Sequence, residues 1–139
     1  MNTEEVCFGA RDDSYGSITM QQSGKILSFK LVHLRGQISC RTVASRYNKW
    51  ACDEGDDLET VLTNEDNAIV FPQLSHIEKR YQLPGMRSDS PELIFNNLTV
   101  PMSVAPGLEF RVWYTEDLKD ISEQDNGGKT CMDVYALYV

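Results

Sequence analysis

The sequence lacks the features that accompany membrane or nucleic-acid binding. No apolar run approaches the roughly eighteen residues that a membrane-spanning helix needs, so we expect no membrane insertion. Lysine and arginine number only 13 among 139 residues, against 21 acidic residues and a net charge of −8. Because nucleic acids are bound mainly through clustered basic side chains, and no such cluster occurs, we expect no nucleic-acid partner.

Motifs of the common enzyme classes are also missing. There is no G-x-S-x-G elbow, Walker loop, H-E-x-x-H helix or dinucleotide-binding glycine pattern. A catalytic cysteine would need a free thiol beside one of the two histidines, His33 and His76. Two carboxylates alone can hydrolyse a glycosidic bond, so a glycoside hydrolase stays a less favoured alternative. The sequence predicts a non-enzymatic protein.

The four cysteines form no C-x-x-C pair, which argues against a structural zinc site. An even number in a small, strand-rich chain is typical of two disulfides. Three pairings can be drawn, and we favour Cys40–Cys52, which closes a short loop, with Cys7–Cys131, which ties the two ends together. Four reduced thiols in the core are the alternative.

What the sequence does contain is a series of short strand patterns separated by turn residues. The clearest covers residues 25–34, where Leu27, Phe29 and Leu31 alternate with polar residues. This strand is expected to continue to residue 40 after a bend at Gly36.

Further strands and one short helix complete the prediction. Residues 58–63 and 68–71, on either side of a turn at 64–67, predict a β-hairpin. Residues 75–78 (SHIE) have the capping-box pattern of a helix start. Many short strands and little helix predict an all-β fold, a single antiparallel, jelly-roll-like β-sandwich with at most one short helix, over residues 1–139.

The last thirty residues predict two strands, 108–114 and 130–139, that frame an oxygen-rich loop. The loop has five carboxylates against one lysine and closes with the turn residues Asp125-Asn-Gly-Gly128. Calcium takes about six to eight oxygen ligands, often from irregular loops. We therefore predict a Ca²⁺ site with the ligands Glu116, Asp117, Asp120, Glu123, Asp125, Asn126 and Asp133. A solvated acidic hairpin, with Asp133 paired to Arg111 across the strands, is the alternative.

A second acidic loop, residues 53–57, follows two aromatic residues. Aromatic rings stack on the C–H faces of sugars while carboxylates hold the hydroxyl groups. We interpret Tyr47, Trp50, Asp53 and Asp56 as a sugar-binding patch, and the 53–57 loop as a second place for calcium. In the alternative interpretation the loop is pinned by a disulfide and Trp50 fills the core.

Residues 110–118 (FRVWYTEDL) and 123–136 (EQDNGGKTCMDVYA) resemble the C-terminal part of secreted domains from cnidarian and other marine-invertebrate extracellular and skeletal-matrix proteins. Residues 29–36 (FKLVHLRG), Ser39-Cys40 and Trp50–Cys52 are similar in kind. The resemblance implies an extracellular setting and disulfides at these cysteines, but no activity. By analogy of fold alone, the pattern is also compatible with galactose-binding-like jelly rolls, which often hold calcium and bind glycans.

We therefore expect a secreted, calcium-binding, lectin-like or adhesion module that recognises a glycan or an extracellular-matrix component. A structural matrix-assembly protein with an acidic surface and no sugar pocket is the alternative. The polar start, Met1–Glu5, is unlike a signal peptide, so secretion requires a leader outside this sequence. Asn97-Leu98-Thr99 matches the N-glycosylation sequon.

Overall fold

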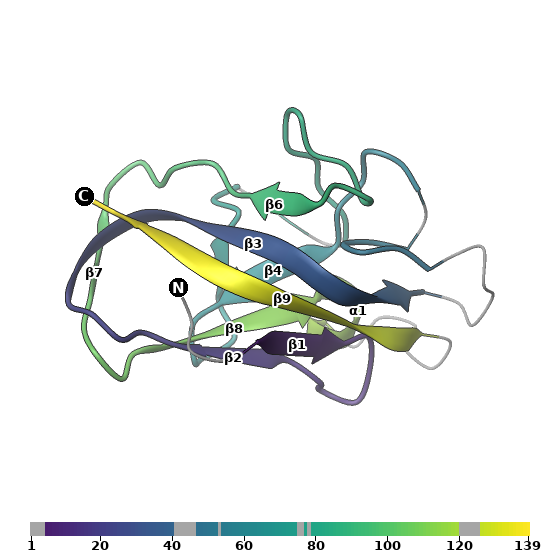
Figure 1. Cartoon of the computed structure of the whole chain (residues 1–139), viewed down its shortest axis with the longest axis horizontal. Coiled ribbons are helices and arrows are strands. Elements are labelled where there is room, and N and C mark those ends of the chain that lie inside the picture. The colour runs from purple at the N-terminus through teal and green to yellow at the C-terminus, as the bar shows by residue number, and fades with distance from the viewer. Residues whose placement is uncertain (1–4, 41–46, 53, 75–76, 78, 120–125) are drawn as a thin grey trace.

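The protein is a sandwich of two antiparallel sheets, seen in a computed structural model that describes residues 5–40, 47–52, 54–74, 77, 79–119 and 126–139 (Figure 1). The first sheet contains β1 (Val6–Gly9), β9 (Gly127–Tyr138), β3 (Gly24–Ser39) and β6 (Glu92–Ile94) in that order, with β7 (Met102–Val104) also paired to β3. The second contains β2 (Gly16–Thr19), β8 (Glu109–Tyr114), β4 (Thr60–Thr63) and β5 (Ile69–Phe71) in that order. The prediction of an all-β sandwich is confirmed.

The long strands β3 and β9 pair from Ile26 opposite Tyr138 to Ser39 opposite Gly127. Strand β3 runs through Gly36, where φ is 82° and an added Cβ would lie 2.1 Å from the carbonyl oxygen of Lys129. Only glycine combines that backbone conformation with so close an approach. The predicted continuation of the strand beyond Gly36 is therefore confirmed.

One detail of the predicted inward face of β3 is wrong. Phe29 and Leu31 are buried as expected, but Leu27 is only half-buried and Ile26 is fully buried instead. The pairing with β9 shifts between Ile26 and Ser28. A bulge of this kind inserts one residue and exchanges the two faces on its far side, which simple alternation cannot anticipate.

Four phenylalanines join the two sheets in the core. The ring of Phe29 in β3 lies edge-on to Phe71 of β5 and Phe110 of β8, with ring centroids 5.3 and 5.2 Å apart. Phe95, just after β6, contacts Phe71 at 5.8 Å. Buried aromatic rings contribute both apolar area and favourable edge-to-face contacts, so this cluster is a main source of cohesion between the sheets.

The hairpin and disulfide predictions are confirmed. Strands β4 and β5 pair antiparallel. In the turn between them, the side-chain oxygen of Asn64 accepts hydrogen bonds from the backbone amides of Asp66 and Ala68. The disulfide Cys7–Cys131 joins directly opposed residues of β1 and β9. The second, Cys40–Cys52, closes the loop after β3.

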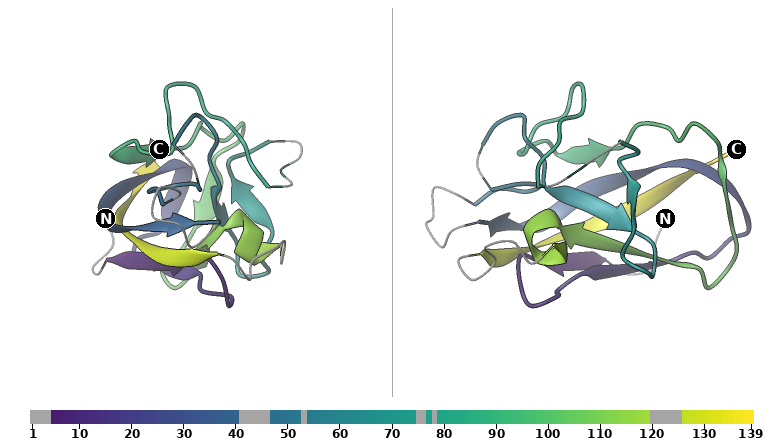
Figure 2. Two further views of the ribbon diagram at one scale, coloured as in Figure 1. Left: turned by 90° about the vertical axis from the view of Figure 1, so that its right-hand side faces the viewer. Right: turned by 180° about the vertical axis from the view of Figure 1, so that it is seen from behind.

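The predicted two-strand frame of the last thirty residues is wrong. Strand β8 pairs with β2 and β4, whereas β9 pairs with β1 and β3 in the other sheet. Strand β8 is followed directly by α1 (Thr115–Leu118), the one helix among the described residues, which lies on the side of the four-stranded sheet (Figure 2, right). Alternation of apolar and polar residues identifies a strand and its buried face, but it does not show which strand lies beside it. The prediction that β8 and β9 lie side by side failed for this reason.

Two further expectations change with this topology. Arg111 forms an ion pair with Glu109 at 2.8 Å, and Asp133 lies opposite Val32 in the other sheet, so the Arg111–Asp133 pair of the alternative interpretation does not form. Residues 75, 76 and 78 of the expected helix start lie outside the described residues. Helix α1 begins after Tyr114 without a side-chain cap, so the capping signal of a helix start is missing there. No helix in the described part of the chain is long and apolar enough to span a membrane.

Candidate functional site

The acidic residues of α1 face the protein interior. Asp117 is fully buried, and its two carboxylate oxygens accept the backbone amides of Asp13 and Ser14, each at 2.9 Å. Asp12 and Asp13 have positive φ values of 64° and 55°. The carboxylate thus holds the tight turn between β1 and β2 in a conformation that is otherwise unfavourable for these residues.

Of the other predicted calcium ligands, Asn126 contacts the same turn as Asp117, whereas Glu116 and Asp133 have other partners or positions. Glu116 accepts a hydrogen bond from the Tyr114 hydroxyl at 3.2 Å, buried Asn126 donates to the carbonyl of Ala10 at 2.9 Å, and Asp133 lies half-buried on β9. Asp120, Glu123 and Asp125 lie outside the described residues. A calcium site in this loop therefore stays a prediction.

Among the described residues, one group of His, Cys and acidic side chains comes close enough to share a metal ion. It consists of Glu5, Cys7 and Cys131. Because the two cysteine sulfurs are bonded to each other, they do not supply thiolate ligands. This group is therefore not a metal site in the disulfide-bonded protein.

Trp50 lies in the core and not on the surface. Its side chain is fully buried, its indole Nε1 donates to the carbonyl of Ser90 at 2.8 Å, and His33 lies edge-on to its ring at 5.9 Å. The alternative interpretation, in which Trp50 fills the core, is confirmed, and the proposed sugar-stacking role of Trp50 is corrected. Of the rest of that patch, Tyr47 is half-buried, Asp56 is exposed and Asp53 lies outside the described residues.

Asp56 borders an open hollow of about 500 Å³ whose other wall is residues 82–87. The carboxylate of Asp56 accepts a hydrogen bond from the Arg87 guanidinium at 3.0 Å, and Gln82 donates to Asp57 at 3.1 Å. Residues 82–87 belong to the loops before β6 (Figure 1). We name the surface formed by Asp56, Gln82, Met86 and Arg87 the polar hollow.

Sequence reasoning found Asp56 but missed Gln82 and Arg87. The available signal was the Pro84-Gly85 turn, which marks an exposed loop. That signal places the loop on the surface, but it does not indicate that Arg87 contacts Asp56, 31 residues earlier in the chain.

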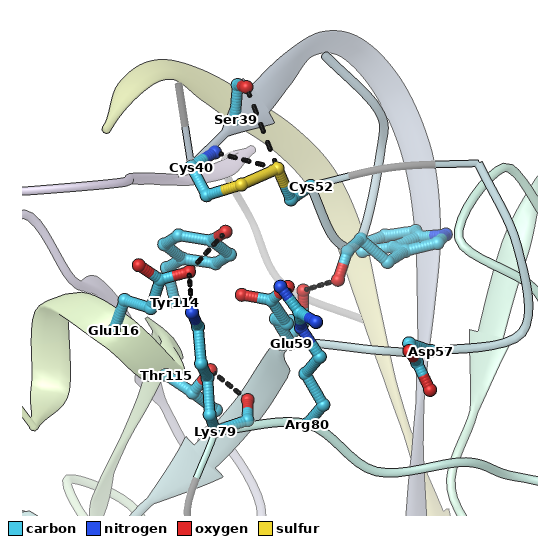
Figure 3. A network of polar contacts seen from close by, with 12 residues as sticks. Ser39, Cys40, Cys52, Asp57, Glu59, Lys79, Arg80, Tyr114, Thr115 and Glu116 are labelled. Carbon is cyan, nitrogen blue, oxygen red and sulfur yellow. Dashed lines mark hydrogen bonds and ion pairs between the residues drawn. A yellow bond between two sulfur atoms is a disulfide. The ribbon is translucent and has the colours of Figure 1, made fainter. Parts of the chain in front are cut away.

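Asp56 also lines a smaller cavity of about 70 Å³, whose wall includes a buried carboxylate, Glu59. Glu59 is 1% exposed and accepts a hydrogen bond from Arg80 Nε at 3.1 Å (Figure 3). Burial raises the pKa of Glu59 from 4.5 to about 7, and the neighbouring Glu116 adds to the rise, whereas Tyr114 and Arg80 favour the charged form.

Tyr114 lies with these two acids. Burial raises the pKa of its hydroxyl well above the usual value, and the charges of Glu59 and Glu116 add to the rise. The hydroxyl therefore stays protonated and donates a hydrogen bond. Glu59 and Glu116 are both about 1% exposed, and their hydrogen-bond and ion-pair partners are Tyr114, Lys79 and Arg80.

Comparison with known proteins assigns the class. No protein-family model and no curated protein matches the chain. Among solved structures, a sea anemone lectin has the same two-sheet architecture over the whole of this chain. That lectin is AJLec from Anthopleura japonica, with a TM-score of 0.90, 31% sequence identity and 95% of its own chain covered.

The chain belongs to the family of AJLec. The resemblance to cnidarian secreted domains is thereby confirmed at the level of a cnidarian lectin-like β-domain. The analogy with galactose-binding-like jelly rolls stays a prediction.

Proposed function

We propose that this protein is an extracellular, non-enzymatic lectin-like module that binds a glycan. The observation that carries the proposal is the match to a sea anemone lectin along the entire chain. The two disulfides are consistent with an oxidising, extracellular environment. Membership of a lectin family also favours glycan recognition over the alternative of a purely structural matrix protein.

The polar hollow is the surface that we propose for sugar binding. Ligand sites are concave and combine apolar surface with a few convergent polar groups. Asp56 accepts hydrogen bonds, Arg87 donates them and Gln82 does both, which suits sugar hydroxyls that are donors and acceptors at once. Met86 and Pro84 line the same hollow and offer apolar surface to the C–H groups of a sugar ring.

We further propose that calcium assists recognition, from one of two sets of oxygen donors. The first is the loop that contains Asp120, Glu123, Asp125 and Asn126, near the start of β9. The second is Glu54, Asp56 and Asp57, which border the small cavity above Glu59. Carboxylates are hard oxygen ligands of the kind that calcium prefers.

A glycan array tests sugar binding. The protein, with its disulfides intact, is applied in calcium buffer and again in EDTA. We expect a few strong signals that free sugar inhibits and that EDTA weakens. A matrix-assembly protein would give no sugar-inhibitable signal under either condition, and that result would remove the proposal.

Thermal melting tests calcium and separates the two donor sets. A ligand that binds only the folded state raises the melting temperature by mass action. We expect a higher melting temperature in calcium than in EDTA for the parent protein. Asp125→Ala abolishes that difference if the first set binds the ion, and Asp56→Ala abolishes it if the second does; equal melting of the parent protein in both buffers would exclude calcium.

A further inference from the structure

The outer face of the five-stranded sheet carries an apolar hollow that is separate from the core and from the polar hollow. It has a volume of about 280 Å³ and is lined by residues that include Lys30, Ile94, Asn97, Tyr135 and Leu137. We name these five residues the Asn97 hollow. Ile94 and Leu137 are 43% and 50% exposed, which is high for large aliphatic side chains.

The sheet register places these residues together. Ile94 of β6 lies opposite Lys30 of β3, which in turn lies opposite Tyr135 of β9. The ammonium group of Lys30 is 4.9 Å from the centre of the Tyr135 ring. Three adjacent strands thus contribute one row of side chains that face outward.

Asn97, at the rim, is the asparagine of the single N-x-S/T sequon in the sequence. Its side chain is exposed, while the backbone on either side is fixed: Phe95 and Leu98 donate their amides to the carbonyls of Phe29 and Leu27 in β3. The backbone amide and the hydroxyl of Thr99 both donate hydrogen bonds to the side-chain oxygen of Gln73, at 2.9 and 3.1 Å. The attachment point is therefore both accessible and rigid.

We propose that Asn97 carries an N-linked glycan and that its first N-acetylglucosamine covers the Asn97 hollow. The acetyl methyl and the C–H face of this sugar would cover Ile94, Leu137 and the ring of Tyr135, and the ammonium of Lys30 would be available to the sugar hydroxyls. Attachment forms a bond from the asparagine Nδ2 to C1 of the sugar; the bond from C1 to the lipid diphosphate of the oligosaccharide donor breaks, the lipid diphosphate leaves, and Nδ2 gives up one proton. The inference rests on the extracellular setting of the proposed function but not on its sugar binding.

Occupancy is measured on protein secreted from insect or mammalian cells behind an added signal peptide. Mass spectrometry is expected to show a glycan that peptide-N-glycosidase F removes, in the parent protein and in Asn96→Gln but not in Asn97→Gln. Asn96 is the matched control because it is exposed, adjacent and outside the sequon. Secreted parent protein without a glycan overturns the proposal, even if it still binds sugars on the array.

Packing of the first sugar is measured separately. Protein with high-mannose glycans is trimmed by endoglycosidase H, which leaves one N-acetylglucosamine, or by peptide-N-glycosidase F, which removes the whole glycan and converts Asn97 to Asp. The unglycosylated variants Asn97→Asp and Asn97→Gln measure the effect of that added charge alone. We expect the singly substituted form to melt a few degrees higher. In Leu137→Ser, whose occupancy should be unchanged, this difference should shrink. Equal melting of the two forms of the parent protein would overturn the covering role.

Discussion

Glu59 and Glu116 lie side by side beneath the basic groups of Arg80 and Lys79, and each carboxylate is about 1% exposed. Two carboxylates in such a setting resist simultaneous ionisation, because burial and mutual repulsion both disfavour the second charge. Glu59 is the member whose pKa rises to about 7. The pair thus makes the folded state hold a proton near neutral pH that the unfolded chain releases.

We therefore predict that the protein is more stable in mild acid than at pH 8. A pKa that folding raises from 4.5 to about 7 contributes stability that is complete below pH 4.5 and is lost as the pH rises through 7. For Glu59 alone this amounts to at most about 3 kcal/mol. Urea unfolding at pH 5 and pH 8 measures the effect, and Glu59→Gln should remove most of the difference between the two.

Glu109 provides the control for that experiment. Hydrogen bonds from Ser17 and Arg111 lower the pKa of Glu109, so its smaller contribution is present at neutral pH and is lost on acidification. Glu109→Gln should therefore leave the pH 5 to pH 8 difference nearly unchanged. A Glu59→Gln variant with the parent's pH dependence would contradict the assignment.

Asp117→Ala is predicted to lower the free energy of unfolding by about 1–3 kcal/mol, because the amides of Asp13 and Ser14 lose their acceptor. The loss should be the same in calcium and in EDTA, as measured by urea unfolding. Asp117→Asn, which keeps one acceptor oxygen, should lose less. A loss that appears only in calcium would identify Asp117 as a metal ligand and would count against this structural role.

Removal of the Cys7–Cys131 disulfide by paired substitution with serine should cost about 2–5 kcal/mol. The two cysteines are 124 residues apart, against 12 for Cys40–Cys52. In the chain-entropy model the longer closed loop restricts the unfolded chain more. Paired serine variants of each disulfide, compared by thermal or urea unfolding, should rank in that order; a larger loss for the Cys40–Cys52 pair would contradict the model here.

Arg87→Ala and Asp56→Ala should each weaken binding of the sugar identified on the array by about tenfold or more, since each removes a charge-assisted hydrogen bond. Isothermal titration calorimetry measures the dissociation constant. Asp66→Ala, an exposed acidic residue in the β4–β5 turn, is the matched control and should bind as the parent does. Equal affinity for all four proteins would place the sugar elsewhere.

The fold was predictable where one local signal decided the outcome. Alternation predicted the main strands, and the cysteine count together with loop length predicted both disulfides. The sheet to which β9 belongs was not predictable. Strands β8 and β9 would show the same alternation of apolar and polar residues whether they paired with each other or belonged to opposite sheets. The burial of Ile26 in place of Leu27 was not predictable either. It results from a bulge between Ile26 and Ser28, and a bulge has no recognisable sequence pattern.

The candidate site was less predictable because it depends on contacts between distant segments. Glu59 interrupts a strand-like run between Leu58 and Thr60, a position that normally faces solvent. It is nevertheless buried, and Arg80, 21 residues later in the chain, forms an ion pair with it. The Asp56–Arg87 contact arises in the same way, across 31 residues.

The Cys7–Cys131 bond also determines how the domain responds to mechanical load. If the two chain ends are pulled apart, tension passes from Cys7 through the sulfur atoms to Cys131, and none of the chain between them carries it. Only the segment before Cys7 and the part of β9 beyond Cys131 can extend. The residues between Cys7 and Cys131 are thus shielded from direct tension, which in an uncrosslinked domain would pass along the whole chain.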